Sequence, residues 1–136
     1  MRRRLHETSV ELEVPFHDVD MLGVVWHGHY YKYFEHARTH LLASCGLDAG
    51  DLIGARYLFV VIESRCRYSA ALRYRARIRV DAWVRDIEHR IFVAFEIHDL
   101  DGGRRSARGH TVLATTDLAG NLLIETPHEI RARLLA

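Results

Sequence analysis

Residues 16–35 read FHDVDMLGVVWHGHYYKYFE, and this stretch carries most of the information in the chain. Asp20 follows a strand-like segment, and Gly23 comes three residues later. A short apolar run then leads to a polar turn at residues 27–29 and to an aromatic-rich amphipathic helix. A carboxylate beside a glycine turn and a helix N-terminus suits acyl transfer. The carboxylate can attack a carbonyl or activate water, while free backbone N–H groups hold the carbonyl oxygen.

Composition bounds the class of protein. The chain has 136 residues, with 49% hydrophobic and 27% charged residues and a formal net charge of +1. We therefore expect one soluble domain spanning residues 1–136, and no strong field that would attract nucleic acid or an anionic membrane. No apolar run is long enough for a membrane span, and the basic start has no apolar signal core behind it. Cys45 and Cys66 fit packed thiols, and the protein is predicted to be cytoplasmic.

The pattern along the chain predicts one strand, one long helix and about four further strands. Val10, Leu12, Val14 and Phe16 alternate with polar residues and Pro15, which indicates a half-buried strand near a sheet edge. The helix carries apolar residues at three- and four-residue spacing, and Gly46 is suited to end it. These apolar positions are Tyr30, Tyr33, Phe34, Ala37, Leu41 and Cys45. Residues 47–56 are expected to form a loop.

The second half of the chain reads as strands at residues 57–68, 73–86, 90–98 and 104–116. The residues 101–103, Asp-Gly-Gly, predict a hairpin turn. Residues 127–134 predict a short terminal helix, with Thr126 as its cap and Glu129 reaching back to it. One helix and several one-faced strands are most economically arranged as an α+β domain, in which an antiparallel sheet curves around the helix. Arginines alternating along the strands require the outer sheet face to be polar.

The segment DVDMLGVVWHGHYY, residues 18–31, resembles the signature of the 4-hydroxybenzoyl-CoA thioesterase family, and is most similar to its YbgC-like acyl-CoA thioesterases. Residues 35–38 continue the helix as that group does, and the likeness covers roughly residues 8–130. Between the second and third strands many relatives carry an acidic residue, whereas this chain has AALRYR at residues 70–75. His17 also replaces a more usual residue. Neither departure touches Asp20.

The resemblance implies a hot-dog fold, with a five-stranded antiparallel sheet wrapped around one long central helix. It also implies a homodimer, commonly paired into a homotetramer, with the active site at the subunit interface. The family's catalytic aspartate matches Asp20, and the turn histidine matches His27. The expected activity is hydrolysis of an acyl or aryl thioester to free acid and thiol.

A thioester needs only a nucleophile, an oxyanion site and a desolvated pocket. Asp20 would serve as nucleophile or as general base, and the sequence leaves both roles open. The backbone N–H of His27, at the helix start, would polarise the carbonyl. The His27 side chain could orient water, protonate the thiolate or shape the turn. Asp18 fits a turn or capping residue better than a second acid, and Glu35 is an alternative helix-borne carboxylate.

Substrate-binding candidates are Gly23, Trp26, Tyr30, Arg65 and Arg67. Gly23 would permit close backbone approach, and the aromatic residues would line an acyl or aryl pocket. Arg65 and Arg67 would approach the phosphates of coenzyme A or the acidic surface of an acyl carrier protein, whereas most other arginines fit a solvated face. No metal and no organic cofactor is expected, because the histidines near Asp20 lack the ligand spacing of a zinc site.

Two other functions fit the same residues. A hot-dog dehydratase or hydratase would act on 3-hydroxyacyl thioesters with a histidine and an acid. A non-catalytic protein would bind an acyl carrier without releasing thiol. Acyl chain length, aromatic or aliphatic preference, and the choice between coenzyme A and a carrier protein are left open by the sequence.

Overall fold

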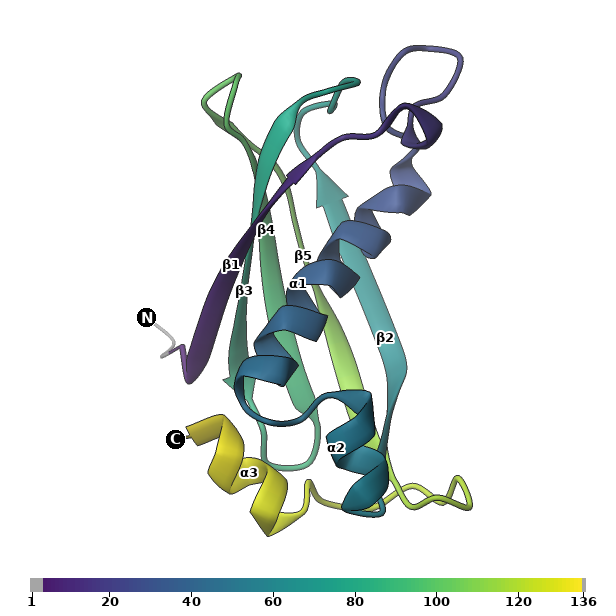
Figure 1. Ribbon diagram of the computed structural model, residues 1–136, viewed down its shortest axis with the longest axis vertical. Coiled ribbons are helices and arrows are strands. Elements are labelled where there is room, and N and C mark those ends of the chain that lie inside the picture. The colour runs from purple at the N-terminus through teal and green to yellow at the C-terminus, as the bar shows by residue number, and fades with distance from the viewer. Residues whose placement is uncertain (1–3, 136) are drawn as a thin grey trace.

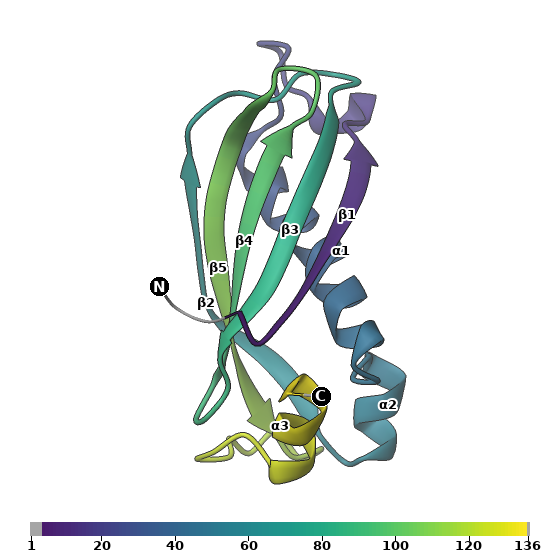
Figure 2. The ribbon, with the colours of Figure 1, turned by 90° about the vertical axis from the view of Figure 1, so that its left-hand side faces the viewer.

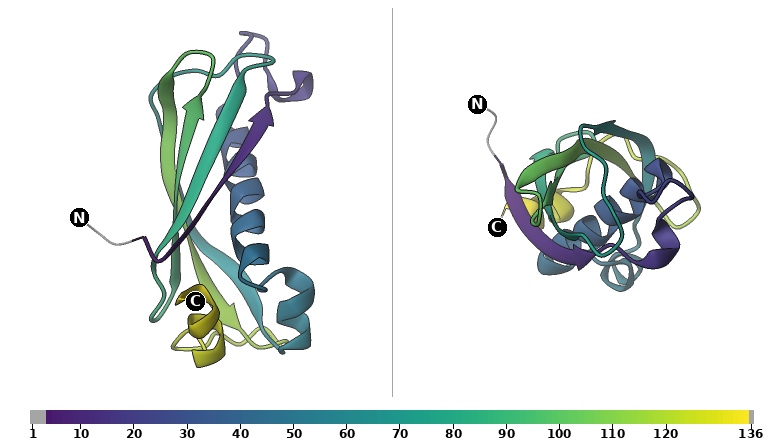
Figure 3. Two further views of the ribbon diagram at one scale, coloured as in Figure 1. Left: turned by 60° about the vertical axis from the view of Figure 1, so that its left-hand side comes forward. Right: turned by 90° about the horizontal axis from the view of Figure 1, so that it is seen from above.

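The computed structural model describes residues 4–135 and shows a five-stranded antiparallel sheet wrapped around one long helix (Figures 1 and 3). The strand order is β1-β3-β4-β5-β2, so β1 and β2 are the edges. The elements are β1 (His6–Glu13), η1 (Phe16–Asp18), η2 (His27–His29), α1 (Tyr30–Ser44), α2 (Ala49–Gly54), β2 (Leu58–Tyr68), β3 (Arg77–Asp86), β4 (Ile91–Asp99), β5 (Arg104–Thr116) and α3 (His128–Leu135). The predicted architecture is confirmed. Residues 1–3 and 136 of the predicted domain lie outside the described part.

Helix α1 is the centre of the core because the curved sheet encloses its apolar face. Its buried residues are Tyr30, Tyr33, Phe34, Ala37, Leu41 and Leu42. Phe34 stacks on Phe95 of β4, with 4.6 Å between the ring centroids. Burying a phenylalanine side chain stabilises a fold by roughly 1.5–3 kcal/mol, so this stack is a major contact between helix and sheet.

The end of α1 is set by Gly46, as the sequence predicts. Gly46 has a φ of 70°, a backbone angle that is unfavourable for residues with a Cβ. Its N–H donates to the carbonyl of Ala43 at 3.0 Å, and the N–H of Leu47 donates to the carbonyl of Leu42 at 2.8 Å. This pair of bonds is a Schellman motif, which satisfies carbonyls that the helix leaves free.

The sheet has an apolar inner face, which packs on α1, and a polar outer face on the side away from α1; Figure 2 shows α1 lying behind the strands. On β3 and β4 the inward residues are buried: Ile78, Val80, Ala82, Val84, Ile91, Val93, Phe95 and Ile97. On the outer face Arg79 donates to Asp81 at 2.9 Å, and Arg77 lies 3.5 Å from Glu11. The alternation in the sequence therefore places the strand faces correctly for β3 and β4.

Three local predictions are wrong. Residues 49–54 form α2 rather than a loop, because Asp48 caps the helix by accepting from the Asp51 N–H at 3.0 Å. Residues 73–76 form a turn, with Arg75 at a φ of 66°, so β3 begins at Arg77. Thr126 does not cap α3 in the described structure, since its hydroxyl oxygen is buried without a partner there, and Glu129 instead accepts from the Tyr57 hydroxyl at 2.6 Å.

None of the helices described within residues 4–135 is long and apolar enough to cross a membrane.

Gly109 of β5 lets α1 lie close to the sheet, and we predict that Gly109→Ala destabilises the protein. A Cβ there would lie 2.2 Å from the Arg65 carbonyl oxygen and 2.7 Å from the Phe34 ring. The backbone or the ring must shift, at a cost of about 1–3 kcal/mol in the free energy of unfolding, measured by urea denaturation. Gly50→Ala in α2 is the control, because its Cβ meets only the Asp48 side chain at 3.6 Å. Equal stability of the two variants would contradict the close approach.

Candidate active site

A buried carboxylate, Asp18, fixes the loop that precedes α1. Asp18 is 1% exposed. The Tyr33 hydroxyl donates to its Oδ2 at 2.7 Å, and the Lys32 ammonium donates to its Oδ1. Its backbone carbonyl accepts from the Trp26 N–H at 3.1 Å. Asp18 therefore joins the two ends of the 18–26 loop to the first turn of α1.

The electrostatics of Asp18 favour the charged form. Burial acts to raise the pKa of the carboxyl, but the hydrogen bonds from Lys32 and Tyr33 and the charges of Lys32 and His29 together hold it below its ordinary value. The ring nitrogens of His29 and His17 lie 3.9 and 3.7 Å from Oδ1. Asp18 is thus an ionised structural anchor, in line with the turn or capping role expected from the sequence.

Asp20 lies in a tight turn within this loop. Its N–H donates to the Val24 carbonyl at 2.9 Å, and the Gly23 N–H donates to the Asp20 carbonyl at 3.0 Å. Gly23 has a φ of 80°, so the turn uses the backbone freedom of glycine. The Leu22 N–H donates to Oδ1 of Asp20 at 2.9 Å. The turn holds one carboxylate oxygen, and the side chain is exposed on the surface of the single chain.

A groove of about 370 Å³ brings Asp20, His27 and Tyr30 together. The 18–27 loop and α1 form one side of it, and the end of β2 with residues 69–71 forms the other. Its lining residues are Asp20, Val24, Val25, His27, Tyr30, Tyr68, Ser69, Ala70 and Ala71. Asp20 therefore lies on a concave surface whose lining is partly polar and partly apolar.

The helix start carries unpaired hydrogen-bond donors, and one of them belongs to His27, which lines this groove. Within residues 4–135 the backbone N–H groups of His27 and Gly28 donate to no protein acceptor, whereas the N–H groups of His29 and Tyr30 are used in the turn. Free N–H groups at a helix start attract a negatively charged oxygen. A carboxylate and the unpaired amide of His27 at one groove are parts that acyl transfer requires.

Tyr68 of β2 holds the turn from the sheet side. Its hydroxyl donates to the His27 carbonyl at 2.8 Å, and its ring meets the Tyr30 ring edge-to-face at 4.8 Å. Burial is the main reason why the pKa of the Tyr68 hydroxyl is raised. The hydroxyl therefore stays protonated and can donate its hydrogen bond. Tyr68 was not predicted as a site residue; its sequence signals are its place at the end of a strand and its match to a position of the family that the chain resembles.

The other candidate residues lie outside the groove lining. Gly23 shapes the Asp20 turn. Trp26 is 50% exposed, and its ring covers Gly28, where a Cβ would lie 2.2 Å from the indole. Arg65 and Arg67 face the outer side of the sheet, where they line a different groove. The structure thus places these two arginines apart from Asp20.

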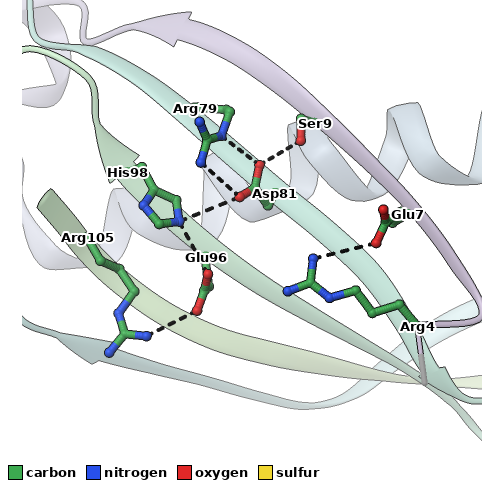
Figure 4. A network of polar contacts seen from close by, with 8 residues as sticks. All are labelled: Arg4, Glu7, Ser9, Arg79, Asp81, Glu96, His98 and Arg105. Atoms are coloured by element: carbon green, nitrogen blue, oxygen red, sulfur yellow. Dashed lines mark hydrogen bonds and ion pairs between the residues drawn. The ribbon is translucent and has the colours of Figure 1, made fainter. Parts of the chain in front are cut away.

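One group within the described residues has the atoms to ligate a metal. Oxygen and nitrogen atoms of Asp81, Glu96 and His98 lie within 4.8 Å of one another on the outer sheet face (Figure 4). Arg79 pairs with Asp81, and Arg105 donates to Glu96 at 3.1 Å. Because the two carboxylates already have cationic partners, we interpret this group as an ion-pair network across the strands.

Comparison with known proteins connects this geometry to a family. The family model described as the thioesterase-like superfamily matches residues 14–134. "Putative esterase sll0410" of Synechocystis sp. is 29% identical over 129 residues, which cover 93% of this chain and 78% of that protein. "Putative acyl-CoA thioesterase YneP" of Bacillus subtilis is 28% identical over 82 residues, 60% of this chain and 59% of that protein.

A solved structure shares the fold. The DHNA-CoA thioesterase of Staphylococcus aureus superposes with a TM-score of 0.80 at 22% identity, over 87% of this chain and 80% of that one. At this identity the likeness concerns the fold alone. The sheet and helix described above are therefore the hot-dog arrangement that the resemblance implies.

We predict that Asp18→Asn lowers the free energy of unfolding by about 2–3 kcal/mol at pH 7, because Lys32 and Tyr33 lose a charged acceptor. The pKa of Asp18 is lowered on folding, so its contribution is present above the ordinary carboxyl pKa of about 4 and is lost as the pH falls through the lowered value. The difference in free energy of unfolding between wild type and Asp18→Asn should therefore shrink below about pH 4. Urea denaturation across a pH series measures it.

The control is Glu125→Gln, which removes an exposed carboxylate. A difference between wild type and Asp18→Asn that stays constant down to low pH would contradict a charged Asp18.

Proposed function

The chain belongs to the thioesterase-like superfamily and is a thioester hydrolase, and from this premise we propose that Asp20 is its catalytic carboxylate. The observation that carries the proposal is the groove that Asp20 shares with His27, whose backbone N–H is unpaired in the described structure. Asp18, the other acid of the loop, is buried and bonded to Lys32 and Tyr33, so it is occupied as an anchor. Asp20 is the acid that a substrate can reach.

Asp20 would act in one of two ways. As nucleophile, the carboxylate attacks the thioester carbon, the C–S bond breaks to release the thiolate, and water then hydrolyses the mixed anhydride that remains. As general base, it takes a proton from a water molecule that attacks the same carbon, and the tetrahedral intermediate collapses with cleavage of the C–S bond and release of the thiolate. The Leu22 N–H holds Oδ1 and leaves Oδ2 free to react, since no partner within residues 4–135 binds it. Both routes use this same oxygen.

The backbone N–H groups of His27 and Gly28 would hold the oxyanion. Negative charge gathers on the carbonyl oxygen as the tetrahedral intermediate forms, and the positive end of the helix dipole favours it there. Tyr68 fixes the turn by its bond to the His27 carbonyl. The donors are therefore oriented before substrate arrives, which lowers the reorganisation cost of the step.

We propose that a second copy of the chain completes the site. The edge strand β2 presents unpaired backbone groups and exposed apolar side chains, with Val60 38%, Val61 48% and Ile62 50% exposed. Met21 and Leu22, beside Asp20, are 102% and 82% exposed. Such an edge favours pairing with another strand. A homodimer through β2 would cover the groove and exclude water from the thioester, and homotetramers would pair such dimers.

The proposed substrate is an acyl or aryl thioester of coenzyme A. The alternative carrier of the acyl group is an acyl carrier protein. The name of the Bacillus subtilis relative supports the coenzyme A thioester. The groove has apolar walls from Val24, Val25 and Ala70, which suit a hydrocarbon or aromatic acyl group.

Asp20→Asn should lower kcat for thioester hydrolysis by about 10³-fold, because the amide neither attacks nor accepts a proton efficiently. Release of free thiol is measured with short aliphatic, long aliphatic and benzoyl-type coenzyme A thioesters. Asn keeps an oxygen for the Leu22 N–H, so the turn should stay folded. Asp86→Asn, an exposed acid in the β3–β4 hairpin, is the control and should keep full activity. Undiminished turnover by folded Asp20→Asn would remove Asp20 from its role.

Ile62→Lys should turn a homodimer into a monomer and lower activity, because a charge on an edge strand opposes strand pairing. Sedimentation velocity and thiol release are measured on the same samples. Glu13→Lys, on the other edge strand β1, is the control and should remain dimeric. A wild-type protein that is monomeric and fully active would contradict completion of the site by a second copy.

A further inference from the structure

A second groove lies on the outer face of the sheet, on the side away from α1 (Figure 2 shows this face). Its volume is about 390 Å³, and it runs over β2, β5, β4 and β3. Its lining residues are Arg65, Arg67, Trp83, Arg85, Ala94, Phe95, Glu96, Arg108, Gly109 and His110. Four arginines therefore line one concave surface. Arginines that only face solvent would not need a groove between them.

The strand register brings two arginines, Arg67 and Arg108, together in this groove. Arg67 of β2 lies directly opposite Arg108 of β5, and Arg65 lies opposite His110. Directly opposed residues of an antiparallel pair have Cβ atoms about 4.5–5.5 Å apart, and like charges at that distance destabilise the sheet. An anion bound between the two arginines would attract both of them, and so replace their repulsion with a net attraction.

The nearby carboxylates already have other partners. Glu96 lies between Arg105 and His98, at 3.1 and 3.2 Å (Figure 4). Glu63 pairs with His110 at 3.0 Å. Within residues 4–135 no carboxylate lies within ion-pair distance of Arg65, Arg67 or Arg108. The positive charge of these three side chains is therefore available to a ligand.

A second copy of the same face is a poor occupant. A two-fold contact through this groove would set its arginines against those of the partner, and the repulsion would oppose assembly. The groove needs a partner with several negative charges in a small volume. Guanidinium groups bind phosphate oxygens through two parallel hydrogen bonds, so a phosphate ester fits this requirement.

We propose that the outer groove binds a phosphate-bearing anion, with Arg65, Arg67 and Arg108 as its ligands. Two sources share this chemistry: a free polyphosphate or nucleotide, and the nucleotide end of coenzyme A. Residues 67 and 68 are neighbours on β2 whose side chains point to opposite faces, Arg67 to this groove and Tyr68 to the Asp20 groove. The site is separate from the proposed catalytic groove and does not depend on hydrolysis.

Isothermal titration calorimetry without any thioester tests the proposal, with inorganic pyrophosphate, ATP and coenzyme A as the three probes. We expect saturable binding of at least one probe, weakened by added salt, and about tenfold or more weaker in Arg67→Gln and in Arg108→Gln. The comparison of the probes assigns the source. Without ligand, both variants should be at least as stable as wild type, because the like-charge contact is relieved.

Two controls separate the site from the rest of the molecule. Arg104→Gln removes an exposed arginine of β5 that does not line the groove, and should bind as wild type does. Asp20→Asn should also bind normally. Three outcomes would overturn the proposal, whatever the result for hydrolysis: no saturable binding of any probe, an affinity equal to that of wild type in both groove variants, or loss of binding in Asp20→Asn.

Discussion

The ion pair between the buried carboxylate of Asp18 and the partly exposed Lys32 is the interaction on which the geometry around Asp20 depends. An ionised carboxylate at the core is costly unless it has partners, and here it takes donors from both Lys32 and Tyr33 of α1. The backbone carbonyl of Asp18 also accepts a hydrogen bond from the Trp26 N–H. The Asp20 turn lies between these two points of attachment. The loop that carries Asp20 is therefore attached to the start of α1 at both of its ends.

In the single chain the candidate site around Asp20 is organised on one side and open on the other. The loop, the helix start and Tyr68 are fixed by hydrogen bonds, while Met21, Leu22 and the β2 edge face outward. Hydrolysis of a thioester gains from a dry pocket, because electrostatic contacts strengthen where water is excluded. Association of two chains would supply in one step both the missing wall and a partner for the edge strand.

Much of the fold follows from the sequence because its signals are local. Alternation places the faces of β3 and β4, three- and four-residue spacing defines α1, and Gly46 ends it. The errors arise where the deciding contact is short-range but not periodic, as with the Asp48 cap of α2 and the left-handed Arg75 turn. The groove residues from β2 and from residues 69–71 meet Asp20 only in three dimensions, so no spacing in the sequence could group them. The arginine register across β2 and β5 is likewise a property of strand pairing.

The tight contact at Gly109 bears on how this protein could change its preference among acyl groups. Phe34, Phe95 and Leu72 fill the space between α1 and the sheet and are at most 1% exposed. An acyl chain therefore has to extend over surface residues and into whatever covers them, rather than along the interior of the protomer. Selectivity can then evolve by exchange of exposed side chains, largely independently of the residues that keep the chain folded.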